Sequence, residues 1–223
     1  ALGKKGQVVK VNDGYARNFI LPKKLGVEAT SKNLNDLKLQ KANAEKIAAE
    51  QLAEAKKLAD KIYLMVVKAP RISANCKPGE FVIVKMDEKG ERIPLTICDY
   101  DREKETITIV FQTVGASTEK MAELKAGDAF RDVVGPLGNA SDFVKEDVAE
   151  LKNKKYLFVA GGVGAAPVYP QVKWMHEHGI DVDVIVGSKT KDLIILEEEM
   201  KAVAGNLYIT TDDGSYERKG MVT

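Results

Sequence analysis

Apolar and polar positions along the chain follow two patterns, which change near residue 62. Between Val27 and Ala69 there is neither Gly nor Pro, and residues 31–62 are rich in Ala, Lys, Glu, Leu and Gln, which favour helix. Apolar residues recur there at steps of three or four, as Ala48, Leu52, Ala55, Ala59 and Ile62. This spacing predicts one helix over 31–62, with Thr30 or Ser31 as its N-cap. Its length would be about 48 Å, and its narrow apolar stripe is typical of a solvated connector.

Beyond residue 62 the apolar runs become short, as in strands. Three of them are rich in Val, Ile, Thr and aromatic residues, at 63–68, 81–86 and 106–111. They predict an antiparallel sheet that forms a small barrel or sandwich. From residue 155, strand and helix patterns alternate, in the order 156–160, 167–178, 182–186, 193–204 and 207–211. That alternation predicts a parallel sheet with crossover helices.

The composition is that of a globular protein. Its 223 residues are 44% hydrophobic and 30% charged, which suffices to bury a core and excludes global disorder. No apolar run approaches the roughly 20 residues that span a bilayer, and no signal peptide is recognisable, so we expect a cytoplasmic protein without membrane contact. Cys76 and Cys98 are too few for a disulfide framework or a four-thiolate metal site. His176 and His178 face different sides of a helix, so we expect no metal site.

The net charge of +1 hides an uneven distribution. Residues 1–62 carry 13 Lys and Arg against 7 Asp and Glu, whereas residues 63–223 carry 21 against 26. The two parts would present opposite charge to a polyanion. The chain therefore divides into two pieces.

The first piece combines glycines with basic and aromatic residues. Its motifs are Gly3-Lys4-Lys5-Gly6 and Gly14-Tyr15-Ala16-Arg17-Asn18-Phe19, with Lys23-Lys24 beyond them. Glycines let a backbone approach phosphates closely, and basic and aromatic side chains suit a nucleic acid. An ordinary basic turn is the alternative.

In motif order and spacing, residues 1–62 resemble the N-terminal half of bacterial large-ribosomal-subunit protein nine. The resemblance implies a partial small β-sheet over 1–30 that binds ribosomal RNA, followed by a connecting helix over 31–62. It implies contacts to RNA phosphates by Lys4, Lys5, Arg17, Lys23 and Lys24. It also implies that Tyr15, Asn18 and Phe19 shape the loop or contact RNA. Lys24 stands where the family usually has a glycine, and the family's first strand and C-terminal RNA-binding domain are not recognisable.

Four motifs in the second piece suit phosphate-containing cofactors. In residues 91–96 an arginine, a rigid turn and a hydroxyl lie on one edge of a β segment, where they can contact a pyrophosphate and a flavin ring. Residues 114–118 place glycine and hydroxyl groups at a helix start, and residues 134–138 form a glycine-containing turn. Residues 158–167 put a buried strand before a glycine loop and a helix, as in dinucleotide sites. Each motif also has an alternative without a ligand. These are a surface strand for 91–96, a helix cap for 114–118, a plain turn for 134–138 and a βα turn for 158–167.

Together these motifs resemble the ferredoxin:NADP reductase superfamily over about 63–223, and most of all its electron-transfer subunits. The resemblance implies α+β and α/β architecture: an antiparallel FAD-binding β-barrel over 63–153 and a partial Rossmann-like parallel nucleotide-binding domain over 154–223. It implies a flavoprotein oxidoreductase with NADP or NAD as substrate, in which the reduced nucleotide, NADPH or NADH, passes a hydride to FAD. The electrons would then pass to an iron–sulfur partner subunit or ferredoxin.

The same resemblance assigns cofactor-binding residues. It implies that FAD is held by Arg92, Pro94, Leu95 and Thr96, with Gly115, Ser117 and Thr118 at its phosphates. It implies a nicotinamide nucleotide loop of Gly161, Gly162, Val163, Gly164, Ala165 and Pro167. Ser188 and Lys189 would recognise the adenosine ribose or its 2′-phosphate, and Lys189 favours NADP. Asp212 to Ser215 end the third strand at the same face, with no role assigned.

Each piece departs from its family at both ends. The first barrel strand should precede Tyr63, where the helix is predicted, and the later nucleotide-domain strands and the Cys-rich segment for a [2Fe–2S] cluster are not recognisable. We therefore assign no cluster and no catalytic residue, expect impaired activity, and interpret the join at 61–63 as a fusion, a chimera or a mis-joined reading frame. The main hypothesis is a flavoprotein reductase portion. The alternatives are a ribosomal RNA-binding protein, and a chain in which neither portion functions.

Overall fold

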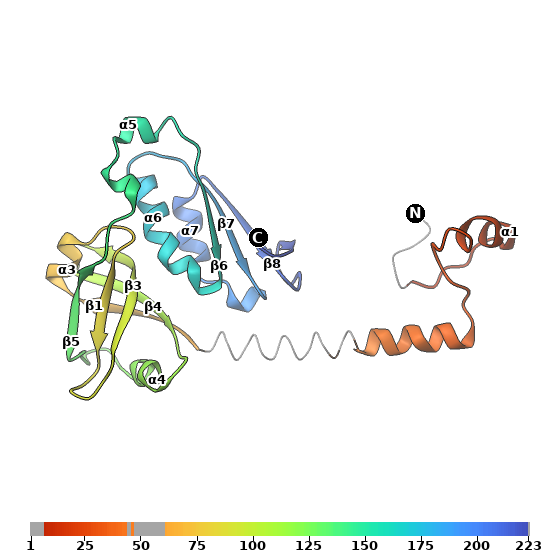
Figure 1. Cartoon of the computed structure of the whole chain (residues 1–223), viewed down its shortest axis with the longest axis horizontal. Coiled ribbons are helices and arrows are strands. Elements are labelled where there is room, and N and C mark those ends of the chain that lie inside the picture. Colours follow the sequence, from red (N-terminus) through yellow and green to blue (C-terminus); the bar gives the residue numbers. More distant parts are fainter. Residues whose placement is uncertain (1–6, 44–45, 47–60, 223) are drawn as a thin grey trace. The chain divides into compact units, whose positions relative to one another are not determined.

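The computed structural model describes residues 7–43, Lys46 and residues 61–222. The chain forms two compact units, Ala1–Ala53 and Glu54–Thr223, which are described separately below (Figure 1).

The described part of the first unit is helical. It contains α1 (Asp13–Tyr15), the short π-helical segment η1 (Ala16–Ile20) and a helix over 31–43 that Lys46 also joins. The side chain of Asn12 caps α1 by accepting a hydrogen bond from the Gly14 amide at 2.9 Å. The expectation of a partial sheet is wrong for residues 7–30, which contain no strand. Residues 7–12 have no strand partner among the described residues, and the cap turns the chain into a helix directly after them.

The predicted connecting helix is confirmed where the structure describes it. Thr30 is its N-cap, since its hydroxyl accepts a hydrogen bond from the Asn33 amide at 3.2 Å. The helix does not reach Ile62 as predicted: Lys61 lies in a turn, and Ile62 begins a strand opposite Gln112. Residues 44–45 and 47–60 of the predicted helix lie outside the described residues.

The second unit begins with an antiparallel sheet in the order β1-β4-β3-β2-β5. Its strands are β1 (Ile62–Lys68), β2 (Phe81–Lys85), β3 (Arg92–Asp101), β4 (Thr106–Gln112) and β5 (Asp132–Leu137). Helix α3 (Pro70–Asn75) follows β1, and α4 (Ala116–Ala122) connects β4 to β5 (Figure 1). The three predicted strands are confirmed. Their inward side chains, such as those of Val82 and Ile109, form an apolar core together with Met121 of α4.

The β segment predicted at 91–96 is part of β3 from Arg92 onward, but the rigid turn expected within it is absent. Pro94 lies inside the strand, opposite Ile83 of β2. A proline is tolerated there because residues 92–96 pair only with β2, while β4 joins β3 from Ile97 onward. Residues 134–137 belong to β5, because pairing with β2 outweighs the turn preference of Gly135 and Pro136. Within residues 134–138, only Gly138 has a left-handed backbone, with φ of 86°.

A parallel sheet in the order β6-β7-β8-β9 completes the unit. Its strands are β6 (Leu157–Gly161), β7 (Asp183–Ser188), β8 (Asn206–Thr211) and the two-residue β9 (Arg218–Lys219). Two 3₁₀ segments, η3 (Gly162–Gly164) and η4 (Lys191–Leu193), follow β6 and β7. The segments η2 (Asp142–Lys145) and α5 (Val148–Leu151) lead into this sheet from β5. The predicted strand and helix alternation is confirmed.

Helices α6 (Ala165–Glu177) and α7 (Glu197–Val203) cover one face of the parallel sheet (Figure 1). Helix α6 begins two residues before the predicted Pro167, because the 3₁₀ turn of the glycine loop runs directly into it. Helix α7 begins four residues after the predicted start, because η4 and the left-handed Leu196, with φ of 58°, precede it.

The two sheets share a core. Cys98 of β3 and Val110 of β4 lie in the same apolar cluster as Val172 and Met175 of α6. Both cysteines are buried, and burial raises the pKa of the Cys76 thiol to about 11 and that of Cys98 to about 12. Among the described residues, no helix is long and apolar enough to cross a membrane.

Candidate functional site

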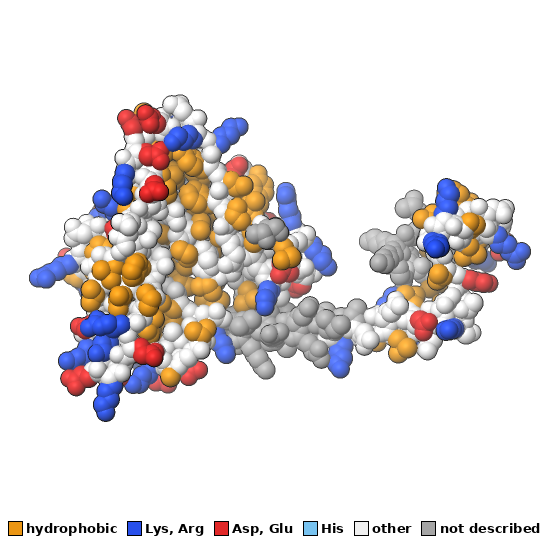
Figure 2. All heavy atoms as spheres, viewed as in Figure 1, with side chains coloured by type: hydrophobic (Ala, Val, Ile, Leu, Met, Phe, Trp, Pro, Cys, Tyr) orange, Lys and Arg blue, Asp and Glu red, His pale blue; other side chains and the backbone are white. Residues whose placement is uncertain are grey.

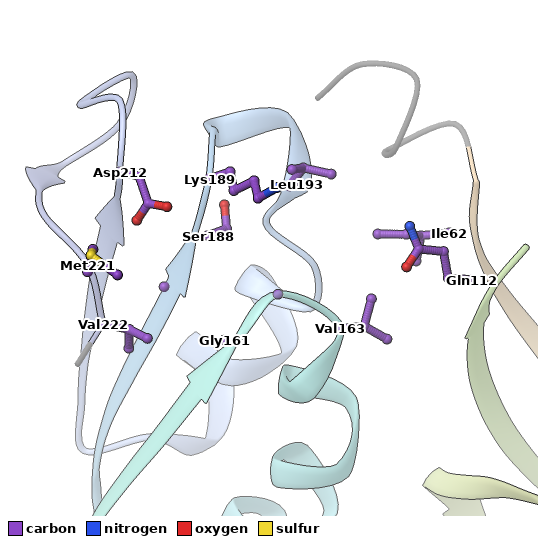
Figure 3. A pocket seen from close by; sticks show the side chains of 12 residues that line it. Ile62, Gln112, Gly161, Val163, Ser188, Lys189, Leu193, Asp212, Met221 and Val222 are labelled. Carbon is purple, nitrogen blue, oxygen red and sulfur yellow. The ribbon is translucent and has the colours of Figure 1, made fainter. Parts of the chain in front are cut away.

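A pocket of about 460 Å³ lies at the carboxyl ends of the parallel strands (Figure 3). Its wall consists of Ile62, Gln112, Gly161, Gly162, Val163, Gly187, Ser188, Lys189, Leu193, Asp212, Met221 and Val222. Ile62 and Gln112 come from the antiparallel sheet, and the other residues come from the ends of β6, β7 and β8 and the segments that follow them. The pocket is therefore shaped by both sheets. Carboxyl ends of parallel strands are the usual location of ligands in open α/β sheets.

The glycine loop forms one side of this pocket. Gly162 has φ of 54°, a backbone conformation that favours glycine, and no atom lies within 4 Å of where a Cβ would stand at Gly162 or Gly164. The loop leads into α6, whose N-cap residue Gly164 provides no side-chain hydrogen bond. The Ala165 amide donates to the Gly162 and Val163 carbonyls, and Pro167 has no amide hydrogen. The remaining amides of the first helical turn lack a capping side chain and favour an anion at this point.

The opposite side of the pocket combines polar and charged groups. Lys189 is exposed and forms no ion pair with another described residue, and Asp212 is exposed after β8. The Ser188 hydroxyl donates a hydrogen bond to the Thr190 carbonyl and is buried. Outside the pocket wall, next to Gly187, the buried hydroxyl oxygen of Thr210 has no partner among the described residues.

The residues after β9 fold back into the pocket. The Gly220 amide donates to the Thr211 carbonyl at 3.0 Å, which brings Val222 over β7 (Figure 3). A Cβ at Gly187 would overlap the Val222 side chain, so this close approach requires a glycine.

The flavin-binding residues predicted on β3 lie on a separate surface. Arg92 is 54% exposed, and its guanidinium lies 3.4 Å from Asp132, a long contact that leaves most of its donors available. Pro94 is exposed, whereas Leu95 and Thr96 are half-buried opposite Val82 and Phe81 of β2. The other edge of residues 92–96 pairs with no described strand, so its backbone groups are open to a ligand.

The structure brings this strand together with the start of α4. The Ser117 hydroxyl donates a hydrogen bond to Glu91, the residue before Arg92, at 2.9 Å. No atom lies within 4 Å of a Cβ position at Gly115. Thr118 is buried, and its hydroxyl accepts from the amides of Val114 and Gly115 at 2.9 and 3.2 Å. Thr118 therefore stabilises the start of α4 from the protein interior.

Sequence reasoning found only part of the pocket wall. Of the predicted nucleotide residues, Gly161, Gly162, Val163, Ser188 and Lys189 line the pocket together. Gly164, Ala165 and Pro167 do not, because they continue into α6, where Ala165 is fully buried. Ile62, Gln112, Leu193, Met221 and Val222 were missed. The one available signal was Gln112, a polar residue that ends an apolar strand three residues before Gly115.

The described residues among the predicted RNA-binding set belong to the first unit, whose visible face carries both basic and apolar side chains (Figure 2). The Tyr15 and Phe19 rings stack with centroids 5.1 Å apart, and the Lys23 ammonium lies 4.2 Å from the Phe19 centroid. Arg17, Asn18 and Lys24 are also exposed. Lys24 has φ of 53°, the conformation for which glycine is the preferred residue. Lys4 and Lys5 lie outside the described residues.

Comparison with known proteins finds relatives for both pieces. Residues 1–37 match the family model of the ribosomal protein L9 N-terminal domain. The chain is 62% identical over 170 residues to a Clostridium beijerinckii protein described as an uncharacterized protein in the adh 3′ region, covering 76% of this chain and 57% of the relative. It is 37% identical over 177 residues to the Thermotoga maritima dihydroorotate dehydrogenase B (NAD(+)) electron transfer subunit homolog, covering 79% of this chain and 60% of the relative.

Solved structures give the same result for the second piece. An NADH-dependent reduced ferredoxin-NADP oxidoreductase, described in connection with flavin-based electron bifurcation, has a TM-score of 0.65 and 37% identity, covering 73% of this chain and 56% of that one. The Amycolatopsis cytochrome P450 reductase GcoB, at 19% identity and a TM-score of 0.58, shares the fold.

The chain is similar to two unrelated protein families. Both resemblances inferred from the sequence are confirmed, and so is the fold class of the second piece. The chain spans less than two thirds of the length of the first curated relatives that it matches.

Proposed function

We propose that residues 62–222 belong to a flavoprotein oxidoreductase that passes electrons from NAD(P)H through FAD to an iron–sulfur partner subunit or ferredoxin. The observation that carries this proposal is the pocket between the glycine loop and the antiparallel sheet. Its loop suits a pyrophosphate, and Gln112 on its other wall lies three residues before the α4 surface assigned to FAD. The named functions of the electron-transfer relatives support the same reaction class.

FAD would be held between β3 and the start of α4. Arg92 supplies positive charge for the pyrophosphate, the open edge of residues 92–96 supplies backbone hydrogen bonds, and Gly115 leaves room for a phosphate. Ser117 and Thr118 shape this surface through the contacts described above. These donors fit an anionic cofactor. The chemistry that FAD supplies when bound is the acceptance of a hydride and the release of single electrons.

The nicotinamide nucleotide would occupy the pocket at the other sheet. The glycine loop from Gly161 to Gly164 would approach its pyrophosphate, while the Ala165 amide closes the 3₁₀ turn by donating to the Gly162 and Val163 carbonyls, and Pro167 fixes the first turn of α6. Ser188 and Lys189 lie where the adenosine ribose would bind. The ammonium of Lys189 favours the 2′-phosphate of NADP, whereas Asp212 would accept hydrogen bonds from the ribose hydroxyls of NAD. We favour NADP because Lys189 has no ion-pair partner among the described residues.

This function implies the domain limits given by the resemblance, with FAD bound by residues 63–153 and the nucleotide by residues 154–223. A cytoplasmic location agrees with it.

A second function, binding of ribosomal RNA by residues 1–30, is favoured by the exposed cluster of Tyr15, Arg17, Phe19 and Lys23.

Replacing Arg92 tests the FAD surface. We expect Arg92→Met to lower the affinity for FAD about 10-fold, because a charge-assisted contact to the pyrophosphate is lost. Flavin absorbance after equilibrium dialysis measures this affinity. Arg131→Met is the matched control, since Arg131 is equally exposed and ion-paired with Glu88. Equal affinity for FAD in both variants would contradict the assignment of Arg92.

Replacing Lys189 tests the choice of nucleotide. Lys189→Ala should weaken NADPH binding about 10-fold and change NADH binding little, because only NADPH carries the 2′-phosphate. Isothermal titration calorimetry with each nucleotide measures both affinities, and Lys145→Ala serves as an exposed-lysine control. A parallel loss of NADH and NADPH binding would show that Lys189 does not read the 2′-phosphate.

The RNA-binding function predicts a salt-dependent affinity. Replacing Arg17, Lys23 and Lys24 together by Ala should weaken binding to ribosomal RNA and reduce the slope of log affinity against log salt by about 2 to 3. Filter binding at several salt concentrations measures the slope. The control replaces Lys32, Lys38 and Lys41 on the helix over 31–43. An unchanged slope in the first variant would refute the assignment.

A further inference from the structure

One ion pair joins the two sheets of the second unit through α6. The Lys173 ammonium lies 2.6 Å from a carboxylate oxygen of Asp99, across 74 residues of sequence. The two side chains are 26% and 30% exposed, whereas every other ion pair shown between described residues has at least one partner exposed by 44% or more. This pair is therefore less screened by solvent than the others.

The carboxylate of Asp99 has a second hydrogen bond besides its contact with Lys173. Its oxygen Oδ1 also accepts a hydrogen bond from the Tyr100 amide at 2.8 Å. The Tyr100 ring lies 5.8 Å from the Lys173 ammonium and 4.8 Å from the Arg102 guanidinium. Asp99 stands at an irregularity in the pairing of β3 with β4, where the register shifts by one residue. The antiparallel sheet thus presents a fixed acceptor to α6.

Helix α6 connects this pair to the glycine loop. It starts at Ala165, directly after Gly164, and Lys173 lies eight residues further on, about 12 Å along the axis. Ala165, Ala166, Tyr169 and Pro170 are buried between these points, so packing against the sheets holds this part of the helix, although Pro170 has no amide to donate to the preceding turn. Val163 of the loop faces the pocket across from Ile62 and Gln112 of the antiparallel sheet (Figure 3).

We propose that Asp99 and Lys173 are positioning residues, which set the distance between the nucleotide loop and the flavin-binding sheet without touching either cofactor. This inference rests on the proposed function. Apolar contacts between α6 and the sheet are non-directional and allow sliding, whereas a charge-assisted hydrogen bond fixes one geometry. Transfer between two bound groups is sensitive to displacements of about 1 Å, so a loosened helix slows transfer even when both ligands are bound.

The test uses the full chain with added FAD and NADPH. In Lys173→Met and in Asp99→Asn, the rate of flavin reduction at saturating NADPH should fall about 10-fold or more, since the pair controls geometry. The dissociation constants of FAD and NADPH should change by less than about twofold, because neither residue contacts a ligand. Lys173→Arg should restore most of the rate. Lys154→Met is the matched control: Lys154 also forms a short ion pair, with Glu146 at 2.7 Å, but on the surface.

A second measurement needs no cofactor. Amide hydrogen exchange in residues 97–101 and 165–173 should be about fivefold faster or more in Lys173→Met than in the unaltered chain, and unchanged in Lys154→Met. If the unaltered chain takes up no FAD, the proposed function fails, and hydrogen exchange alone decides whether the pair anchors α6. Unchanged exchange overturns the inference. An unchanged rate of flavin reduction at saturating NADPH in Lys173→Met and Asp99→Asn also overturns it. So does a loss of FAD binding in these variants that accompanies the fall in rate.

Discussion

The packing of α6 against β3 and β4 is the contact on which the second unit depends. It joins an antiparallel and a parallel sheet into one body through a continuous apolar cluster that contains Cys98, Val110, Val172 and Met175. The pocket exists only because of this contact, since its wall takes Ile62 and Gln112 from one sheet and the glycine loop from the other. Apolar burial holds the sheets together. The half-buried ion pair of Asp99 and Lys173 adds a directional contact between β3 and α6.

Backbone geometry determines what the pocket can bind. Gly162 takes a left-handed conformation, Gly164 leaves the start of α6 uncapped by a side chain, and Gly187 permits the approach of Val222. Such a surface offers amides and a helix N-terminus, which suit an anionic ligand.

The first unit has a different kind of surface. No side chain among its described residues is buried, and its aromatic rings stack on each other at the surface beside basic groups. This composition suits a partner such as RNA that covers the rings and neutralises the charge.

The elements with a regular apolar period were predictable from the sequence, because burial on one face imposes that period. Strands β1, β2, β4, β6, β7 and β8 were identified in this way. Residues 91–96 were placed on a β segment, but Pro94 was misread as a rigid turn within it and residues 134–137 as a turn, because strand pairing with β2 outweighed the local preference of Pro94, Gly135 and Pro136. Gly161, Ser188 and Lys189 were predictable because each directly follows or ends a parallel strand. Gln112 and Val222 were not, because tertiary folding alone brings them to the pocket.

An anaerobic titration of the FAD-supplemented full chain with NADPH, followed by flavin absorbance, shows whether the second unit is a flavoprotein that a nicotinamide nucleotide reduces. We expect the protein to retain FAD after removal of the free cofactor, and we expect NADPH to bleach the bound flavin. A protein that stays colourless after incubation with FAD, or a bound flavin that remains oxidised in excess NADPH and NADH, would contradict this expectation.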